Sequence, residues 1–302
     1  MKNLKLIKQA INKEYPEFDI SSVKKMGEGD NSKAFLINKN YIFRFAKRED
    51  VKVSFRKEIK VLPKIEPFLP LQIPKLKFVS KETDFVGYKS IPGEFMSAKI
   101  YKLSGKKVRK QLQISLSKFL SNLHNIDLGI LKDCGLETMN YKEEYSNDYI
   151  KIQRLIFPNI SIKKKNLITE FYHLYLDNKN NFEYNPSLIH NDFSQDHILL
   201  RKSTKEVNGI IDFGDIAIGD PDYDLMYLSD NPGAKFIQEM LQFYNPDNYI
   251  KLMKKLSFFS MANKLQIIIE DIERNDAYLI KKGYKKLDKW FDQHKKKNSF
   301  FR

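Results

Sequence analysis

Residues 187–215 read SLIHNDFSQDHILLRKSTKEVNGIIDFGD, and two short apolar runs in this stretch each end in an acidic loop. The run SLI leads into His190 and Asp192. The run GII leads into Asp212 and Gly214, and Asp212 follows Asp192 by twenty residues. Short apolar runs bounded by polar loops are typical of buried strands. The sequence therefore predicts two strands whose ends present carboxylates at the mouth of a cleft.

These side chains suit different tasks. Asp192 could accept or orient the proton of a substrate hydroxyl, and His190 could brace its loop by hydrogen bonds. Asp212, beside a flexible glycine, is well placed to hold Mg²⁺ on the phosphates of a nucleotide, and His197 would face that metal. Two histidines and two aspartates in one loop could instead bind zinc, but their spacing matches no recognisable zinc signature.

A glycine-rich segment and a charged pair lie closer to the start of the chain. Gly27, Gly29 and Ser32 fall between two runs rich in β-forming residues, where glycines let backbone N–H groups approach a phosphate. An ordinary hairpin turn has the same composition. Arg44 lies in the strand-like run YIFRFAK and Glu58 in the helix-like run FRKEIKVL, so a strand cation could pair with a helix carboxylate. The alternative is a surface ion pair, which contributes little stability.

The first ninety residues are predicted to form a small lobe of mixed structure. Apolar residues at helical spacing indicate helices, and runs of β-forming residues on either side of polar turns indicate strands. Proline inside a helical pattern interrupts or kinks the helix. The expected elements are a helix over 4–15, a hairpin around Asn38-Lys39-Asn40, a helix over 54–66 interrupted or kinked near Pro63, and strands over 75–80 and 85–91.

From residue 95 the pattern becomes helical. An apolar stripe over 111–126 predicts a buried helix, and further helices are expected at 163–177 and 234–294. Together these patterns predict an α+β protein. Its β-rich N-lobe would span 1–90 and bind the nucleotide, its mostly helical C-lobe would span 91–302, and a hinge would lie at about 88–93.

The motifs, taken in order, resemble those of one family. HNDFSQDHILL, with His190-x-Asp192, and GIIDFGDIAIGDPDYDL, with Ile211-Asp212-Phe213-Gly214-Asp215 and Gly219-Asp220-Pro221-Asp222, are similar to the aminoglycoside phosphotransferases. They are most similar to the 2″-aminoglycoside phosphotransferases. The resemblance extends to GEG, YIFRFAK, KEI and FVGYKSIPG, and so covers most of residues 20–230. It implies the bilobal protein-kinase-like fold and phosphoryl transfer to a sugar hydroxyl.

The resemblance implies a role for each matching residue. Asp192 would be the catalytic base or the residue that orients the hydroxyl, and Asp212 would be the main Mg²⁺ ligand. His197 stands where the broader family has a metal-binding asparagine, and because imidazole is a poorer Mg²⁺ ligand than oxygen, it could act through water. Arg44, with Glu58 beside it, stands where most relatives have lysine and presents a planar fork in place of a point charge.

The resemblance also implies a nucleotide pocket. Residues 85–91 are similar to the strand and hinge that bound the base pocket, and the backbone around Tyr88, Ser90 and Ile91 would hydrogen-bond the purine edge. Ile211 would complete the nucleotide contacts. A bulky Tyr88 at the gate position is similar to relatives that favour GTP over ATP, so GTP is the expected donor and ATP the alternative.

An aminoglycoside is a polycation, so its pocket is expected to be acidic. Besides Asp192, the expected substrate contacts are Asp230, Glu239, Glu270 and Asp271. Glu270 is the first choice because it follows the apolar run QIII at a place resembling the family's substrate helix. The alternative for this last group is a solvated helix face. Asp220 is expected to brace the catalytic loop.

Composition narrows the partners and the cellular setting. The 302 residues carry a formal net charge of +15, which would suit a nucleic acid, but the lysines come in short dispersed runs without a stacking platform. No apolar run is long enough to span a membrane. A single cysteine, Cys134, fits a reducing compartment. We therefore expect a cytoplasmic monomer with neither a nucleic-acid nor a membrane partner.

The sequence thus predicts a 2″-type aminoglycoside O-phosphotransferase that uses Mg²⁺ and GTP or ATP and gives antibiotic resistance. A kinase of another hydroxylated metabolite, such as choline or an amino sugar, would share every catalytic motif. A kinase fold that has lost catalysis and acts as a binding module is the non-enzymatic alternative. A basic nucleic-acid-binding protein would instead show steep salt dependence and no nucleotide turnover.

Overall fold

The structure is a computed structural model that describes residues 2–29, 31–246 and 248–295. The chain divides into two compact units. Unit 1 comprises Met1–Glu137 and Ser187–Ile218, and unit 2 comprises Thr138–Pro186 and Gly219–Arg302. The predicted lobes, 1–90 and 91–302 with a hinge at about 88–93, are a different division of the chain and stay a prediction.

Unit 1 contains a five-stranded antiparallel sheet with the strand order β1-β2-β3-β5-β4. The predicted hairpin around Asn38-Lys39-Asn40 is confirmed, because it joins β2 to β3. Asn38 and Lys39 adopt left-handed backbone angles, with φ of 52° and 59°, which asparagine tolerates better than most residues. The strands are β1 (Val23–Glu28), β2 (Ser32–Ile37), β3 (Tyr41–Ala46), β4 (Leu76–Val79) and β5 (Phe85–Lys89).

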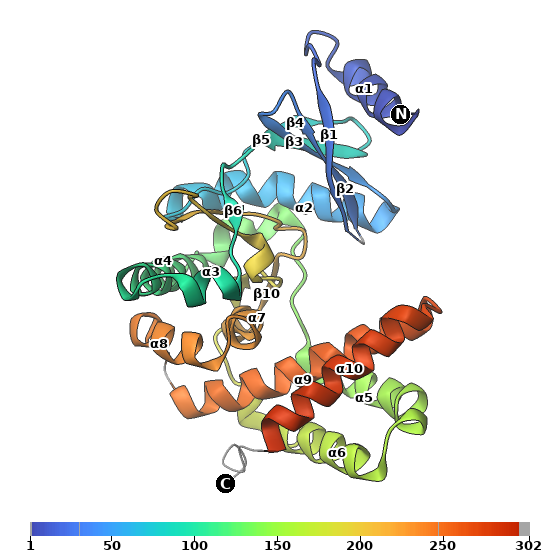
Figure 1. Cartoon of the computed structure of the whole chain (residues 1–302), viewed down its shortest axis with the longest axis vertical. Coiled ribbons are helices and arrows are strands. Elements are labelled where there is room, and N and C mark those ends of the chain that lie inside the picture. The colour runs from blue at the N-terminus through green and yellow to red at the C-terminus, as the bar shows by residue number, and fades with distance from the viewer. Residues whose placement is uncertain (1, 30, 247, 296–302) are drawn as a thin grey trace. The chain divides into compact units, whose positions relative to one another are not determined.

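The register of β3 against β5 decides which side chains share a face of the sheet. Phe43 is opposite Gly87, and this face packs against Ile11 of helix α1 (Lys2–Glu14) and Phe78. Arg44 is opposite Val86 and therefore points to the other face. There Val86 packs on helix α2 (Glu49–Ile65), which lies along the sheet in Figure 1. Arg44 is thus directed toward the helix that carries Glu58.

Helix α2 differs from its predicted extent. It begins at Glu49, five residues before the predicted start, and it continues through Pro63 to Ile65 without interruption. Glu49 and Asp50 in its first turn stabilise the start of the helix by interacting with the helix dipole. Pro63 lies in the last turn and removes one i→i−4 hydrogen bond there, but the helix continues past it. The predicted interruption at Pro63 was therefore wrong, and the predicted kink stays a prediction.

The rest of unit 1 carries the two acidic loops. The predicted strand before His190 is β7, which pairs with β10, and the predicted strand before Asp212 is β9, which belongs to a three-stranded sheet of order β6-β8-β9. The apolar stripe over 111–126 is buried on helix α4, which begins earlier than predicted. The elements are β6 (Glu94–Phe95), α3 (Ala98–Leu103), α4 (Lys106–His124), β7 (Ser187–Ile189), β8 (Ile198–Leu200), β9 (Val207–Ile210) and β10 (Ala217–Gly219), with 3₁₀ turns η1 (Glu66–Phe68), η2 (Leu128–Cys134) and η5 (Gln195–His197).

Unit 2 is helical and is organised around α9 (Tyr249–Glu273). The Phe258 ring on α9 stacks on Tyr175 of α6 with a centroid distance of 3.7 Å. Lys255 on α9 is buried, and its Nζ lies 2.5 Å from a carboxylate oxygen of Asp220 and of Asp222. The other elements are α5 (Tyr141–Leu155), α6 (Ile162–Leu176), α7 (Met226–Asp230), α8 (Ala234–Tyr244) and α10 (Ala277–Lys295), with η3 (Phe157–Asn159), η4 (Lys179–Phe182) and η6 (Pro221–Leu225).

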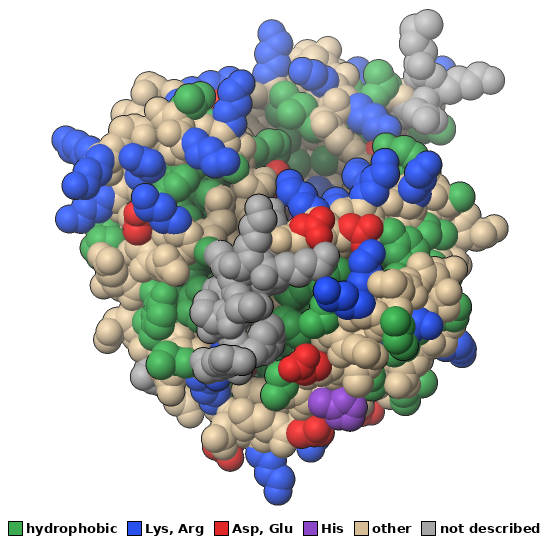
Figure 2. Space-filling model, turned by 60° about the horizontal axis from the view of Figure 1, so that its bottom comes forward, with side chains coloured by type: hydrophobic (Ala, Val, Ile, Leu, Met, Phe, Trp, Pro, Cys, Tyr) green, Lys and Arg blue, Asp and Glu red, His purple; other side chains and the backbone are tan. Residues whose placement is uncertain are grey.

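The observed elements confirm the predicted α+β class, with a five-stranded antiparallel sheet early in the chain and helices later. In the described part of the chain, no helix combines the length and apolar character needed to cross a bilayer. On the face shown in Figure 2, Lys and Arg side chains form several groups, and Asp and Glu side chains are fewer.

Candidate active site

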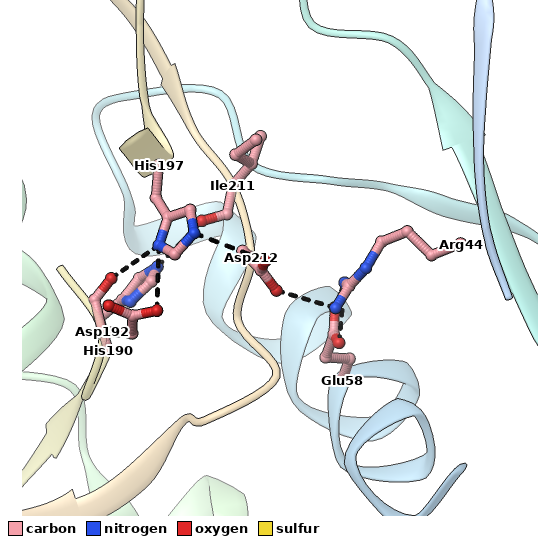
Figure 3. Close-up of polar contacts among 7 residues, drawn as sticks. All are labelled: Arg44, Glu58, His190, Asp192, His197, Ile211 and Asp212. Carbon is pink, nitrogen blue, oxygen red and sulfur yellow. Dashed lines mark hydrogen bonds and ion pairs between the residues drawn. The ribbon is translucent and has the colours of Figure 1, made fainter. Parts of the chain in front are cut away.

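Residues from four separate stretches of unit 1 meet at one site, which Figure 3 shows in close-up. Strand β3 supplies a cation and helix α2 a carboxylate. The loop after β7, the turn η5 and the loop after β9 supply the other groups. The seven residues drawn are Arg44, Glu58, His190, Asp192, His197, Ile211 and Asp212.

His190 joins the two acidic loops. Its side chain is buried, and Nε2 lies 3.1 Å from the carbonyl oxygen of Ile211, the residue just before Asp212. Because a carbonyl oxygen only accepts, Nε2 carries the proton and donates. The imidazole also packs on Phe213 at a centroid distance of 4.6 Å. These contacts give the bracing of the loop that the sequence suggested for His190.

Asp192 lies at the end of the loop after β7, with its side chain about one-third exposed. Burial raises the pKa of its carboxyl to about 6, the nearby charge of His197 opposes this rise, and the charges of Asp215 and Asp212 add to it. The carboxyl is therefore mostly ionised at neutral pH and has a proton affinity close to that of imidazole. Such a group can accept a hydrogen bond from a hydroxyl and take up its proton.

His197 lies between the two aspartates. Its Nδ1 is 2.8 Å from the backbone carbonyl oxygen of Asp192, so Nδ1 carries a proton and donates. In the neutral ring this leaves a lone pair on Nε2, which is 3.6 Å from Oδ2 of Asp212. An imidazole nitrogen and a carboxylate oxygen are thus adjacent and both able to bind a metal.

Whether these donors suit Mg²⁺ depends on their number and on their chemistry. Within residues 2–29, 31–246 and 248–295, no cluster of three or more His, Cys, Asp or Glu side chains has the arrangement of a metal site. Mg²⁺ usually takes only one or two protein carboxylates and completes its shell with phosphates and water. Asp212 would supply one such carboxylate oxygen, and His197, whose imidazole is a poorer Mg²⁺ ligand, would lie beside it.

Arg44 connects the sheet to the second aspartate. Nη1 donates to both carboxylate oxygens of Glu58 at 2.9 and 2.8 Å, and Nη2 donates to Oδ1 of Asp212 at 2.8 Å. Glu58 is fully buried, and burial raises its pKa to about 7, although the guanidinium opposes the rise. At Asp212 burial raises the pKa, but the charges of Arg44, His197 and His190 and a backbone hydrogen bond at Gly214 together lower it below its usual value. The alternative of a surface ion pair is wrong, because the Arg44–Glu58 pair is buried.

The glycine-rich segment forms the β1–β2 hairpin. The N–H of Gly29 donates to the carbonyl oxygen of Ser32 at 3.1 Å, which pairs the two strands next to the turn. A Cβ added at Gly27 or at Gly29 would meet no atom within 4 Å, so packing inside the protein does not explain either glycine. Asp30 lies outside the described residues.

The predicted base-pocket residues lie at the end of β5 and just after it. Tyr88 is buried on the same face of the sheet as Arg44, since it is opposite Ile42. The N–H of Ser90 donates to the carbonyl oxygen of Asn40 at 2.7 Å, so a purine could use only other backbone groups here. The Ile211 N–H donates to the carbonyl oxygen of His197 at 3.0 Å. This hydrogen bond joins Ile211 to the segment that carries Asp192 and His197.

The predicted substrate acids other than Asp192 all belong to unit 2. Asp230, at the end of α7, accepts from Ser260 Oγ at 2.5 Å and pairs with Lys264. Glu239 on α8 lies 3.9 Å from Lys235. On α9, Glu270 lies 3.3 Å from Arg274, and the Asp271 side chain is buried. These residues are therefore distributed over three helices, and their contact with a substrate stays a prediction.

Two features of the site were not predicted. The bridge from Arg44 to Asp212 joins residues 168 positions apart, and no local pattern encodes it. Asp215 is the other: burial raises its pKa, and the charge of Asp212 adds to the rise. Its place three residues after Asp212 in the motif DFGD was the available signal.

Asp220, expected to brace the catalytic loop, accepts from the N–H of Asp222 and pairs with Lys255.

A model of the phosphotransferase enzyme family matches residues 23–254, which is most of the chain and includes every group in Figure 3. The chain therefore belongs to this family, and it is a phosphotransferase.

Solved structures agree with this assignment. The GDP and kanamycin complex of APH(2″)-IIIa superposes with a TM-score of 0.91 at 26% identity, covering 95% of this chain and 98% of that one. The streptomycin–ATP ternary complex of APH(2″)-IIa gives 0.75 at 27% identity, with 94% and 95% covered. A macrolide 2′-phosphotransferase from Brachybacterium faecium gives 0.74 at 14% identity, with 94% and 97% covered, and shows the fold alone. The predicted kinase-like fold and the similarity to 2″-aminoglycoside phosphotransferases are confirmed.

Proposed function

We propose that this phosphotransferase moves the γ-phosphoryl group of a nucleoside triphosphate to a hydroxyl of an aminoglycoside, with 2″ regiochemistry. The observation that carries the proposal is the placement of Asp192 and Asp212 on either side of His197. One carboxylate can receive the hydroxyl proton while the other faces the donor. The GDP, kanamycin, ATP and streptomycin named in the related structures support this choice of substrates.

Each residue then has a part in the transfer. Asp192 aligns the hydroxyl and accepts its proton, because its pKa of about 6 lets it act at neutral pH. Bound Mg²⁺, held by Asp212 and His197, would neutralise phosphate charge. Arg44, fixed by Glu58, donates to phosphate oxygens, and the open space at Gly27 and Gly29 admits the phosphates beside the hairpin backbone.

For the donor we propose GTP, because Tyr88 fills the sheet face beside the expected base pocket. ATP is the competing choice, since one related structure contains it. Comparing kcat/KM for the two nucleotides decides this point, and a higher value for ATP contradicts the proposal. In a cell, the proposed reaction would inactivate the antibiotic. A cell that holds the enzyme in its cytoplasm would therefore be resistant.

The first experiment measures nucleoside diphosphate release with GTP or ATP and Mg²⁺, with and without kanamycin or gentamicin. Asp192→Asn removes the proton acceptor with little change in shape and is expected to lower antibiotic-dependent turnover at least a hundredfold. Asp196→Asn is the matched control, because Asp196 is an exposed acid of the same loop, and it should retain most of the turnover.

The other outcomes identify the alternatives. Turnover that kanamycin and gentamicin do not stimulate, but choline or an amino sugar does, would contradict the aminoglycoside and favour a metabolite kinase. Nucleotide binding with no turnover on any hydroxylated substrate would favour a binding module that has lost catalysis. Full turnover by the Asp192→Asn variant would refute the role given to Asp192.

A further inference from the structure

One segment of unit 1 carries a high positive charge that no acidic residue within it offsets. Between Glu94 and Asp127 there is no acidic residue, yet the segment holds six lysines and Arg109. It therefore contributes +7 of the total formal charge of +15 from 32 residues. Its basic residues are interspersed with other residues, so no long run of charge marks this segment in the sequence.

The two helices of the segment pack against one another. Tyr101 of α3 is buried, its hydroxyl accepts from Gln113 Nε2 of α4 at 3.0 Å, and the Arg109 guanidinium lies 5.8 Å from the centre of its ring. Only Ser104 and Gly105 separate the helices. These contacts hold α3 on the first turns of α4, so the exposed residues of both helices belong to one region of the surface.

That region is rich in exposed lysine. On α4 the apolar stripe faces the interior, and Lys106, Lys107, Lys110 and Lys118 are all exposed. At 100° per residue these four positions fall within an arc of about 120°. Lys99 and Lys102 are exposed on α3, one turn apart. We call these six lysines, together with Leu103, the α3–α4 surface.

Leu103 gives this surface an apolar point. It is the last residue of α3 and is 77% exposed. In the sequence it directly follows Lys102, and Lys106 and Lys107 come three and four positions after it. An exposed leucine among flexible ammonium groups gives no advantage in water, but it suits a boundary between anionic headgroups and acyl chains.

We propose that the α3–α4 surface binds the anionic headgroups of a lipid bilayer, with Leu103 entering the interface. Lysine clusters are attracted to anionic lipid surfaces, and each added lysine strengthens the binding several-fold. Peripheral binding needs no membrane-spanning helix, so it is compatible with the absence of one from the described chain. The proposal differs from the sequence-based expectation of no membrane partner. That expectation rested on the lack of an apolar run long enough to span a membrane.

A nucleic acid is the competing polyanion, and the surface suits it less well. Single-stranded nucleic acids are bound by exposed aromatic rings. The α3–α4 surface contains no aromatic ring, and Tyr101 beside it is buried beneath Arg109. Arginine binds phosphates and base edges through its planar guanidinium. Residues 95–126 contain one arginine, Arg109, and its guanidinium already contacts the Tyr101 ring. The exposed leucine has no role in a phosphate groove.

The test is flotation of the full-length protein with phosphatidylcholine vesicles, with and without about 30% phosphatidylglycerol, at low and at physiological salt. The wild type should bind only the anionic vesicles, more weakly as salt rises. The variant Lys102→Gln, Lys106→Gln, Lys107→Gln should bind at least tenfold more weakly. Leu103→Gln should weaken binding several-fold and leave the remaining binding more sensitive to salt, because only the electrostatic part is retained.

The matched control is Lys281→Gln, Lys282→Gln, Lys285→Gln, which removes the same charge from exposed positions of α10 in unit 2. It should bind within about threefold of the wild type. Equal loss in both triple variants would mean that only net charge matters and would overturn the proposal. So would equal binding to neutral vesicles, or no vesicle binding together with tight duplex DNA binding that the α3–α4 triple abolishes. Unchanged circular dichroism and nucleotide binding would show that the variants are folded.

Discussion

At the scale of single residues, Arg44 explains why the site holds together. Its guanidinium donates to Glu58 through one nitrogen and to Asp212 through the other. A lysine ammonium is a point charge on a flexible chain and cannot hold two carboxylates in fixed directions in this way. The planar guanidinium therefore explains why residue 44 is arginine, although the resemblance implies lysine at this position in most relatives.

Arg44→Met tests this bridge. The variant leaves the carboxylate of Glu58 buried without its partner, so the free energy of unfolding should fall by about 3 kcal/mol at pH 7.5. Loss of the guanidinium should also raise the pKa of Glu58 further above the value of about 7, whereas its ordinary value is 4.5. Between these values the folded state holds a proton that the unfolded state releases, so stability falls as pH rises. Urea unfolding should show a larger loss at pH 8.5 than at pH 6.

The double variant Arg44→Met, Glu58→Gln is the control for the bridge. It leaves no uncompensated charge in the interior, so it should recover most of the stability and lose the added pH dependence. If the double variant is as unstable as Arg44→Met, the loss comes from packing of the side chain and not from the buried carboxylate.

At the scale of elements, the β1–β2 hairpin has glycines that its own packing does not require. Gly27 lies in β1 opposite Ala34, with open space where a side chain would be. In most strands a glycine at such a position only weakens the strand. The pairing of β1 with β2 also shifts register at this position, and glycine occurs in strands both at bulges and where a ligand approaches the backbone closely.

Gly27→Val is the corresponding prediction. The added side chain meets no protein atom within 4 Å of its Cβ, so the free energy of unfolding should change by less than about 0.5 kcal/mol. The same side chain would occupy space beside the backbone that the phosphates need, so the Kd for GDP with Mg²⁺ should rise at least tenfold. Calorimetric titration measures the affinity.

Met26→Val is its matched control. Met26 is the neighbouring exposed residue of β1 and lies where the pairing with β2 shifts register. This variant should bind GDP as the wild type does. Equal weakening in both variants would mean that a branched residue disturbs the hairpin as a whole, and would contradict a phosphate contact at Gly27.

The helices and strands also show how much of the structure could be predicted from the sequence. Local signals sufficed for the Asn38–Lys39 turn, for the strands that end at His190 and Asp212, and for the apolar stripe of α4. They failed at the start of α2, because the predicted helix over 54–66 does not include Glu49 and Asp50, the acids that stabilise the first turn. They failed also at the Arg44–Asp212 bridge, because two positions so far apart meet only through the register of β3 and β5 and the path of β9.

At the scale of the whole molecule, the two compact units divide the predicted contacts between them. Every predicted nucleotide and metal ligand lies in unit 1, and the substrate acids other than Asp192 lie in unit 2. Ligand binding stabilises the region that holds the ligand against local opening. The two kinds of ligand should therefore protect different parts of the backbone.

Amide hydrogen exchange can measure that division. GDP with Mg²⁺ should slow exchange in unit 1, chiefly over 23–46, 85–91 and 190–214. Kanamycin alone should slow it in unit 2 over 226–276 if Asp230, Glu239, Glu270 and Asp271 bind the antibiotic. Antibiotic protection confined to unit 1 would contradict those four contacts without affecting the role of Asp192.

The discontinuity of unit 1 bears on how the enzyme is made. A ribosome completes the five-stranded sheet and the Arg44–Glu58 pair first, then makes Thr138–Pro186 of unit 2, and only afterwards supplies the strands that carry Asp192 and Asp212. Until then the third member of the Arg44 bridge is missing from the nascent chain. A chain released before residue 192 therefore has the five-stranded sheet but neither aspartate, and such a fragment is not active.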